Sequence, residues 1–259
     1  MKKVLLFVSV VMIGLISCKK NDDVMSGGVF KGPEKVFQHG KAWTWVKLDK
    51  SGKPERVGIT IDKAAMESLD PGDDGGGHNH ANAISLAFHE KAGVTPFKHA
   101  LLDWNPHGHE PAGVYDLPHF DYHFYMTSEQ ERMAIPVFEQ AQAKFENYPA
   151  TGYTPENYFP IPGGVPQMGV HWADATSGEM NGEEFTQTFL YGSYDGKVTF
   201  YEPMITKAFI DANTSFSRNF GVPTKFAQDG YYPTKMKIEK ENGAVSVVLE
   251  GFVYRKKTK

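Results

Sequence analysis

Residues 185–205 read FTQTFLYGSYDGKVTFYEPMI, and this stretch predicts a β-hairpin. Two runs rich in β-branched and aromatic residues flank Asp195-Gly196, a pair that supplies the positive φ angles of a type I′ turn. A second hairpin is predicted where residues 234–240 and 244–254 flank Asn242-Gly243. Hairpins join neighbouring antiparallel strands, so both stretches predict antiparallel sheet.

The chain before these hairpins also has mostly the two-residue period of strands. Strands are predicted at 57–61, 84–88, 97–104 and 119–125, and Asp62 is expected to cap a short helix after the first. We therefore expect a mainly β fold, a β-rich α+β protein built as an antiparallel barrel or sandwich with one or two packed helices.

The strongest helix prediction covers residues 128–145. Ser128 and Glu131 have the spacing of a capping box, and apolar residues such as Phe138 and Phe145 recur on one side. Pro136 has no amide hydrogen and is expected to lie in the first turns or to kink the helix.

The N-terminus has the pattern of a signal peptide. Lys2 and Lys3 precede an apolar run that is too short to span a bilayer. Leu15-Ile16-Ser17-Cys18 resembles the lipobox of bacterial lipoproteins, which implies cleavage before Cys18 and acylation of Cys18, for example with palmitate. The expected organisation is a signal peptide at 1–17, a lipidated tether at 18–35 and a single β-rich domain at 36–259.

The same resemblance predicts a place in the cell envelope. Lys19 follows Cys18, so the aspartate that commonly retains lipoproteins at the inner membrane is absent, and an outer-membrane lipoprotein is expected, periplasmic or surface-exposed. The expected partner is therefore the membrane, through the lipid anchor. Because Cys18 is the only cysteine, disulfides within the chain and thiol catalysis are excluded.

Charge argues against nucleic acid as a partner. The net charge is −4, and loss of Lys2 and Lys3 with the signal peptide makes the chain more acidic. Binding to a phosphate backbone requires a basic patch, and the only dense basic run is Arg255-Lys256-Lys257. We interpret that run as a solubilising tail.

Histidines concentrate in one part of the chain and predict a metal site. Imidazole and carboxylate groups together suit Zn²⁺, Mn²⁺ or Fe²⁺, and neighbouring strands can bring them to one centre. The favoured ligands are His109, His119, Asp121, His123 and His171. No catalytic residue can be assigned, and whether the protein is an enzyme stays open.

Spacing limits which of these residues can share one ion. On a strand, residues i and i+2 lie about 6.6 Å apart on one face, whereas i and i+4 lie about 13 Å apart. Asp121 could therefore join His119 or His123, but both histidines on one ion would need a bulge. The alternative interpretation is that this polar face is simply exposed to solvent.

Two other signals are weaker. His107-Gly108-His109 resembles the His-x-His motif of cupin barrels, although Glu110 is closer than the cupin glutamate and only His171 could be the distant histidine. The segment 70–80, rich in glycine and acidic residues, fits neither a calcium loop nor a phosphate loop, and we expect a mobile loop.

Residues 104–125, 168–172 and 196–203 resemble a family of secreted bacterial β-rich proteins with no assigned activity. That resemblance implies a shared β-rich domain and no reaction. Two hypotheses follow: a lipid-anchored envelope protein with a His/Asp divalent-metal site, which could serve a metalloenzyme, or a non-catalytic envelope protein. The second would bind a small molecule or carbohydrate in an aromatic groove or form a homo-oligomer. Glu202 is the one carboxylate of the second half that we single out.

Overall fold

A computed structural model describes residues 27–71 and 82–258, and within them most strands form two seven-stranded antiparallel sheets. The first sheet has the order β1-β3-β4-β15-β14-β12, with β2 paired to β3. The second has the order β5-β6-β7-β11-β10-β9-β8, and β13 pairs separately with β16. The first sheet contains β1 (Gly28–Lys31), β2 (Lys35–Phe37), β3 (Gly40–Leu48), β4 (Pro54–Ile61), β12 (Ser215–Asn219), β14 (Lys235–Glu241) and β15 (Ala244–Glu250). The other strands are β5 (Ile84–Ala87), β6 (His99–Asn105), β7 (His119–Tyr125), β8 (Tyr158–Pro160), β9 (Val170–Asp174), β10 (Gln187–Tyr194), β11 (Lys197–Thr206), β13 (Gly230–Tyr232) and β16 (Val253–Arg255).

Both predicted hairpins are confirmed. β10 pairs with β11 around Asp195, and β14 pairs with β15 around Asn242. These two residues have φ angles of 49° and 51°, the left-handed backbone that the turn requires. Of the two predicted architectures the sandwich is found and the closed barrel is not, because each sheet ends in edge strands.

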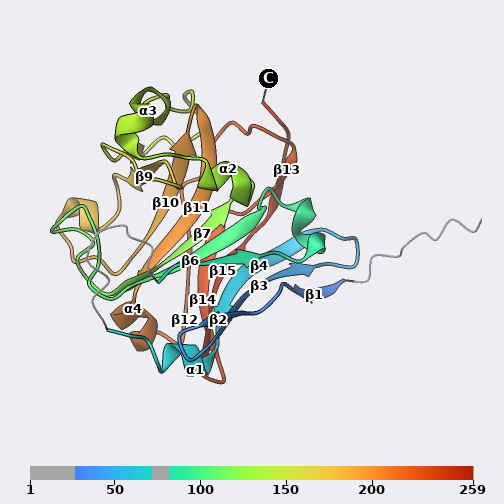
Figure 1. The fold of residues 1–259 in the computed structure, drawn as a ribbon. Helices are drawn as coiled ribbons and strands as arrows, with labels where there is room; N and C mark the ends of the chain where they lie inside the picture. The colour runs from blue at the N-terminus through green and yellow to red at the C-terminus, as the bar shows by residue number, and fades with distance from the viewer. Residues whose placement is uncertain (1–26, 72–81, 259) are drawn as a thin grey trace, which may run out of the picture.

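The core lies between the two sheets, whose strands lie beside one another in Figure 1, blue and red against green and orange. β4 contributes Val57, Ile59 and Ile61, and β7 contributes alternate aromatic residues to the same apolar cluster. Phe189 of β10 stacks on Phe220 with ring centroids 3.7 Å apart. The burial of these aromatic faces is the main favourable term that holds the sheets together.

The outer faces of the two sheets differ. The outer face of the first sheet carries part-exposed charged side chains, including Lys47 and Arg56. The outer face of the second sheet is covered by loops, and two small apolar clusters form beneath them. One joins Tyr115 and Phe185 to Leu190 of β10, and the other places Met168 against the sheet. The second sheet is therefore buried on both sides.

Helices are short. They are α1 (Lys63–Met66), α2 (Glu129–Met133), α3 (Phe138–Phe145) and α4 (Lys207–Ala212), with 3₁₀ helices at Glu90–Val94 and Glu179–Asn181. Asp62 caps α1, and the Ser128–Glu131 capping box is formed at α2, as predicted. The single helix predicted over 128–145 is wrong, because the chain leaves the helix between Ala134 and Val137. Pro136 lies in that break, where its missing amide hydrogen prevents a continuous helix.

The first sheet begins earlier than expected. β1 lies within residues 18–35, the predicted tether, and pairs with β3 from Gly28 to Lys31. Phe30 is the reason, since it packs against the core while its neighbour Val29 remains exposed. Cys18 and residues 1–17 lie outside the described residues. Within the described part of the chain, no helix is long and apolar enough to cross a membrane.

Candidate metal centre

β7 runs through the second sheet between β6 and β11 and presents different chemistry on its two faces. Phe120, Tyr122 and Phe124 point into the sandwich. The opposite face carries the polar residues of the strand, yet it is not exposed to solvent: His119 and His123 have 0 % exposure and Asp121 has 2 %. The solvent-exposed interpretation of this face is therefore excluded. Buried polar groups require partners, and the overlying loop and β11 supply them.

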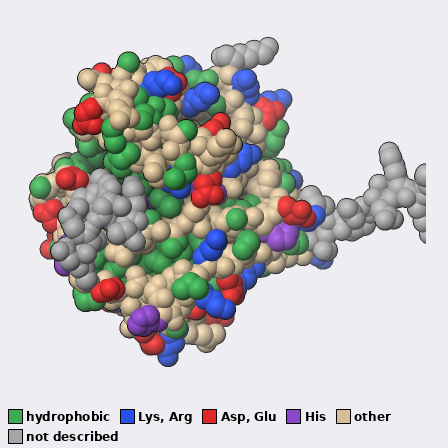
Figure 2. Space-filling model, viewed as in Figure 1, with side chains coloured by type: hydrophobic (Ala, Val, Ile, Leu, Met, Phe, Trp, Pro, Cys, Tyr) green, Lys and Arg blue, Asp and Glu red, His purple; other side chains and the backbone are tan. Residues whose placement is uncertain are grey.

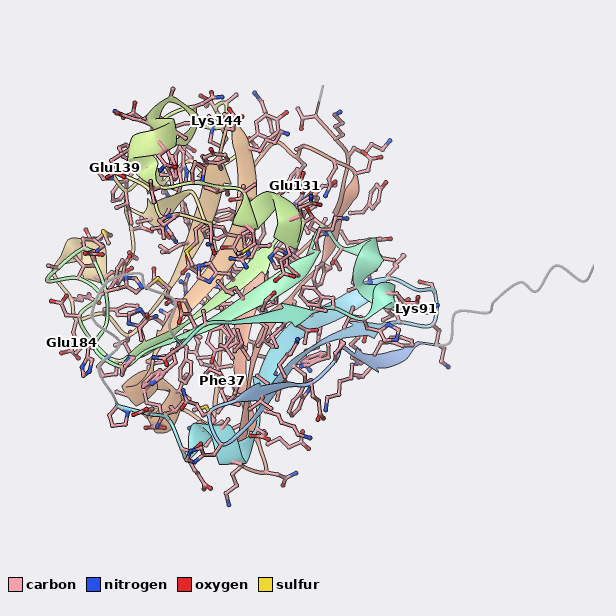
Figure 3. The ribbon with its side chains drawn as sticks, viewed as in Figure 1. Phe37, Lys91, Glu131, Glu139, Lys144 and Glu184 are labelled. Carbon is pink, nitrogen blue, oxygen red and sulfur yellow. The ribbon has the colours of Figure 1, made fainter. Side chains whose placement is uncertain are left out.

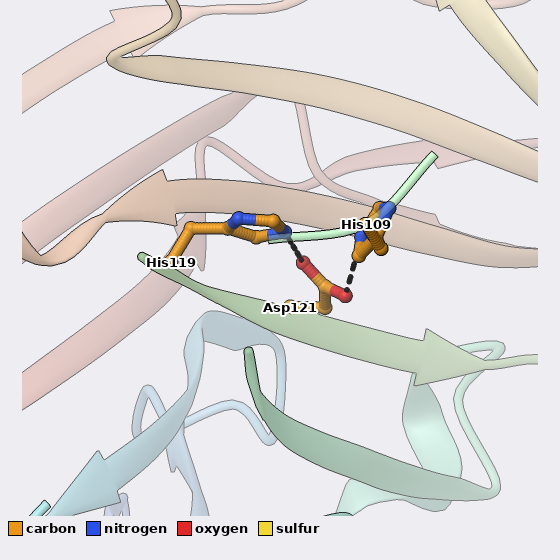
Figure 4. A group of neighbouring side chains, drawn as sticks. All are labelled: His109, His119 and Asp121. Carbon is orange, nitrogen blue, oxygen red and sulfur yellow. Dashed lines mark hydrogen bonds and ion pairs between the residues drawn. The ribbon is translucent and has the colours of Figure 1, made fainter. Parts of the chain in front are cut away.

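Three residues, which we call the first trio, converge over β7: His109, His119 and Asp121 (Figure 4). Both histidines contact the carboxylate of Asp121. His109 Nε2 lies 3.2 Å from Asp121 Oδ2, and His119 Nε2 lies 3.2 Å from Asp121 Oδ1. His109 comes from the loop before β7, where its backbone amide donates to Tyr115 O at 3.0 Å. Gly108 has φ 73° and lies too close to the Tyr115 and Asp116 backbone for a side chain. The loop geometry therefore fixes the direction of His109.

The other ring nitrogen of each histidine reveals its tautomer. His109 Nδ1 lies 2.7 Å from Glu110 O, and His119 Nδ1 lies 2.6 Å from Leu117 O. A carbonyl oxygen only accepts hydrogen bonds, so both Nδ1 atoms carry a hydrogen. In a neutral ring Nε2 then has only a lone pair, and here it faces a carboxylate oxygen that is also an acceptor. These contacts are favourable only when a proton or a metal cation lies between the two atoms.

Electrostatics at the first trio favour an ionised carboxylate. Burial opposes that charge, but His119 and His109 hold the pKa of Asp121 well below its ordinary value. Asn105 Nδ2 also donates to Asp121 Oδ2 at 2.8 Å. Burial likewise opposes protonation of His109, yet the charge and hydrogen bond of Asp121 outweigh it and raise the pKa of His109. The ionised carboxylate of Asp121 therefore favours a positive charge, either a proton or a cation, within the first trio.

A second trio lies farther along the same sheet face and consists of His123, His171 and Glu202. His123 Nε2 is 3.1 Å from Glu202 Oε1, and His171 Nε2 is 3.5 Å from Glu202 Oε2. The pairing of β7 with β11 keeps one register on both sides of Glu202, which places Glu202 opposite His123. The ladder is interrupted there because Pro203 has no amide hydrogen to donate. His171 reaches the same point from β9.

Gly192 and Phe200 set the space around the second trio. Gly192 of β10 pairs with His171 of β9 on one side and with Phe200 of β11 on the other. A Cβ atom at Gly192 would overlap the Phe200 ring. That ring packs against both histidines, 5.0 Å from His123 and 5.2 Å from His171 between centroids. The absence of a side chain at Gly192 thus lets Phe200 form an apolar wall beside the trio.

Glu202 behaves differently from Asp121. Burial, followed by the negative charges of Asp121 and Asp103, raises the pKa of Glu202 well above its ordinary value. Glu202 is 1 % exposed and Asp103 is 4 % exposed, so water does not screen these charges. Three acidic side chains lie on one buried sheet face, and a bound cation would compensate their charge.

The spacing of the candidate ligand atoms fits a metal ion. Within each trio the three ligand atoms lie within 4.8 Å of one another. A tetrahedral ion bonded at 2.0–2.1 Å separates neighbouring ligand atoms by about 3.3 Å, close to the 3.1–3.5 Å nitrogen–oxygen distances found here. Each trio could therefore hold one metal ion through two imidazole nitrogens and one carboxylate oxygen.

A cavity of about 300 Å³ lies beside both trios. It touches the one histidine of each trio that is not fully buried, His109 at 8 % exposure and His171 at 9 %. Its other walls are mostly apolar: Glu110, Pro111, Tyr115, Ile161, Pro162, Gly164, Val165 and Leu190. A small molecule in this cavity would meet both trios from the same side.

All five residues predicted as metal ligands lie in these trios, but they divide between two centres instead of forming one. The division follows the spacing rule, since His119 and His123 belong to different trios. Glu202, which the sequence singled out only as unusual, completes the second trio. His107, the other half of the cupin-like pair, is exposed and belongs to neither. Residues 72–80 of the segment for which we expect a mobile loop lie outside the described residues.

Comparison of the chain with family models, with curated proteins and with solved structures gave no match. The interpretation of the trios as a metal centre therefore depends on their geometry alone.

Proposed function

We propose that the protein binds divalent transition-metal ions at the two trios and is a metal-dependent enzyme acting on a small molecule that enters the cavity between them. The observation that carries the proposal is the contact of His109 Nδ1 and His119 Nδ1 with backbone carbonyl oxygens. Their Nδ1 hydrogens are committed to backbone carbonyls, so both Nε2 lone pairs converge on Asp121. A divalent cation satisfies all three groups at once.

The donor set limits the choice of metal. Two imidazoles and one carboxylate suit Zn²⁺, Mn²⁺ or Fe²⁺ and are a poor match for Ca²⁺ or Mg²⁺, which prefer oxygen ligands. An ion held by the two imidazoles and the carboxylate of a trio would supply Lewis-acid activation of water or substrate. The chain itself contributes the cavity, whose lining beside the trios includes Tyr115 and Leu190.

The proposal includes a location in the cell envelope. The lipobox-like sequence ending at Cys18 supports acylation and an outer-membrane anchor. Replacement of Cys18 by serine should abolish incorporation of labelled palmitate and release the protein into the soluble fraction. Two results would contradict the anchor: wild-type protein that incorporates no labelled palmitate, or a Cys18→Ser variant that stays in the membrane fraction.

Metal content tests the central proposal. The mature chain, loaded with Zn²⁺ or Mn²⁺ and dialysed, should retain two equivalents by mass spectrometry, one for each trio. His109→Ala and Glu202→Gln should each lose one equivalent, since each removes a ligand from a different trio. His107→Ala is the matched control, because this exposed histidine lies two residues from His109, and it should keep both equivalents.

A clear result would overturn the proposal. Wild-type protein with less than about a tenth of an equivalent of metal, and no rise in melting temperature on addition of Zn²⁺ or Mn²⁺, would show that the trios do not bind metal. Circular dichroism of each variant separates loss of a ligand from loss of the fold.

A further inference from the structure

A second and larger cavity, of about 480 Å³, lies at one end of the sandwich and shares no lining residue with the cavity at the trios. It forms where the end of β7, the β10–β11 turn, the loop after Phe220 and the C-terminal segment meet. Its lining residues are Met126, Thr127, Glu131, Ala150, Tyr153, Gly196, Lys197, Val198, Tyr201, Pro223, Lys225, Phe226, Ala227, Gln228, Tyr232 and Lys257.

Aromatic rings form much of the inner wall. Tyr201 is fully buried among the aromatic residues of the core, and Phe226 packs on Tyr232 with centroids 4.5 Å apart. Tyr232 Oη donates to Gln228 O at 3.1 Å, which fixes that ring. Tyr153 completes the set. Flat, rigid walls of this kind favour a planar apolar ligand, because little side-chain entropy is lost on binding.

The rim is positively charged. Lys197, Lys225 and Lys257 line the opening, together with a single acid, Glu131 of α2, which is labelled in Figure 3. Among the described residues none of these three lysines lies within 4.0 Å of a carboxylate. In Figure 2 blue Lys and Arg side chains lie among red Asp and Glu side chains at the upper end of the molecule, where Figure 1 places the C-terminus, whereas the lining of this cavity has three lysines and one acid. This local charge contrasts with the chain's net charge of −4.

Backbone hydrogen bonds hold the lysine-bearing segments in place. Lys225 N donates to Gly152 O at 2.8 Å, and Lys257 N donates to Asp229 Oδ1 at 2.6 Å. Glu131 is occupied by its capping box, accepting from Ser128 N at 2.8 Å. The basic tail is therefore fixed beside the cavity, and its charge is available to a ligand.

We propose that this cavity binds a small organic anion that has a planar apolar body and a carboxylate, sulfonate or phosphate head. The apolar body would lie against Tyr201, Phe226 and Tyr232, with the head among the three lysines. Binding here is independent of the metal trios, because the two cavities have no lining residue in common. The site gives the alternative, ligand-binding hypothesis a specific location.

Calorimetric titration with 2-naphthoate tests this proposal on the mature chain. We expect 2-naphthoate to bind about tenfold more tightly than the uncharged 2-naphthamide, and acetate alone to bind weakly, since body and head both contribute. Addition of a chelator should leave the affinity unchanged. Equal affinities for naphthoate and naphthamide would overturn the assignment of an anionic ligand.

Variants locate the binding. Lys225→Met and Lys257→Met should each weaken 2-naphthoate binding about threefold without affecting 2-naphthamide, as expected for rim charges. Lys50→Met, which removes an exposed lysine from the β3–β4 turn, is the charge-matched control and should change nothing. Ala227→Trp adds a large side chain to an exposed lining position and should abolish binding of both compounds. Unchanged binding in Ala227→Trp, or no binding of either compound to wild-type protein, would overturn the proposal.

Discussion

The two trios contain the same kinds of side chain, two histidines and one carboxylate, on one buried sheet face, yet their carboxyl pKa values are displaced in opposite directions. Asp121 has a lowered pKa, because two imidazoles whose outer nitrogens are held by carbonyls surround it. Glu202 has a raised pKa, because it is buried and lies near Asp121 and Asp103. The donor set alone therefore does not determine the charge of a buried carboxyl group.

The difference has a consequence for metal binding. A metal ion at the first trio meets a carboxylate that is already ionised, and its competitor is the proton on His109. At the second trio the ion must displace a proton from Glu202 itself. Each trio therefore binds metal more strongly as the pH rises, but for a different reason. Substitutions of Asp121 and Glu202 should show how the charge of each carboxyl group depends on pH.

The largest expected effect is that of Asp121→Asn. This change keeps the shape of the side chain but removes the charge that faces His109 and His119, which leaves those two rings without an anion. We expect the free energy of unfolding of the metal-free protein to fall by about 3 kcal/mol at pH 6. Urea denaturation followed by tryptophan fluorescence, in the presence of a chelator, measures the change.

The pH dependence provides a check on that result. A carboxyl group with a lowered pKa stabilises the fold above its unfolded pKa, and this stabilisation is lost as the pH falls through the folded value. Asp121→Asn should therefore lose most stability near neutral pH and least in acid. An equal loss of stability at every pH would show that packing, and not charge, is responsible.

An effect of intermediate size is expected for Gly192→Ala. The new methyl group would displace the buried Phe200 ring, and we expect a loss of about 2 kcal/mol in the free energy of unfolding. Since Phe200 contacts both histidines of the second trio, metal binding should weaken there and persist at the first trio. Gly93→Ala is a suitable control, because its methyl group would meet nothing within 4 Å. Weakening at the first trio alone would contradict this account of the packing.

The smallest expected effect, of opposite sign, is that of Glu202→Gln. A carboxyl group with a raised pKa favours the fold in acid, and that contribution is lost as the pH rises from the unfolded pKa through the folded one. A neutral amide removes this loss, so metal-free Glu202→Gln should be more stable than wild type by about 1 kcal/mol at pH 8. At pH 4 the two proteins should match. A variant less stable than wild type at pH 8 would show that Glu202 is ionised and paired.

Local sequence predicts much of the fold but not the pairing of distant strands. Asp195-Gly196 and Asn242-Gly243 identify their hairpins because turn geometry depends on adjacent residues. The position of Glu202 opposite His123 depends on the contact between β7 and β11, for which no neighbouring residue carries a signal. The second trio could therefore be predicted only in part.

The sequence also does not predict that the polar face of β7 is buried. Alternation along residues 119–125 separates an apolar face from a polar one, but a period of two is the same whether the polar face meets water or a covering loop. The loop that carries His109 and the one that carries Met168 decide the matter by folding over the second sheet. The density of histidines is the signal that the sequence offers, and the five residues chosen from it all lie in the two trios.

Anomalous X-ray diffraction at the zinc absorption edge, on crystals of the mature protein grown with Zn²⁺, would locate any metal ion bound at the trios. We expect two anomalous peaks on the outer face of the second sheet, one bonded to His109, His119 and Asp121, and one bonded to His123, His171 and Glu202. Crystals that show no anomalous peak at either trio, with Asp121 and Glu202 instead hydrogen-bonded directly to the imidazoles, would contradict it.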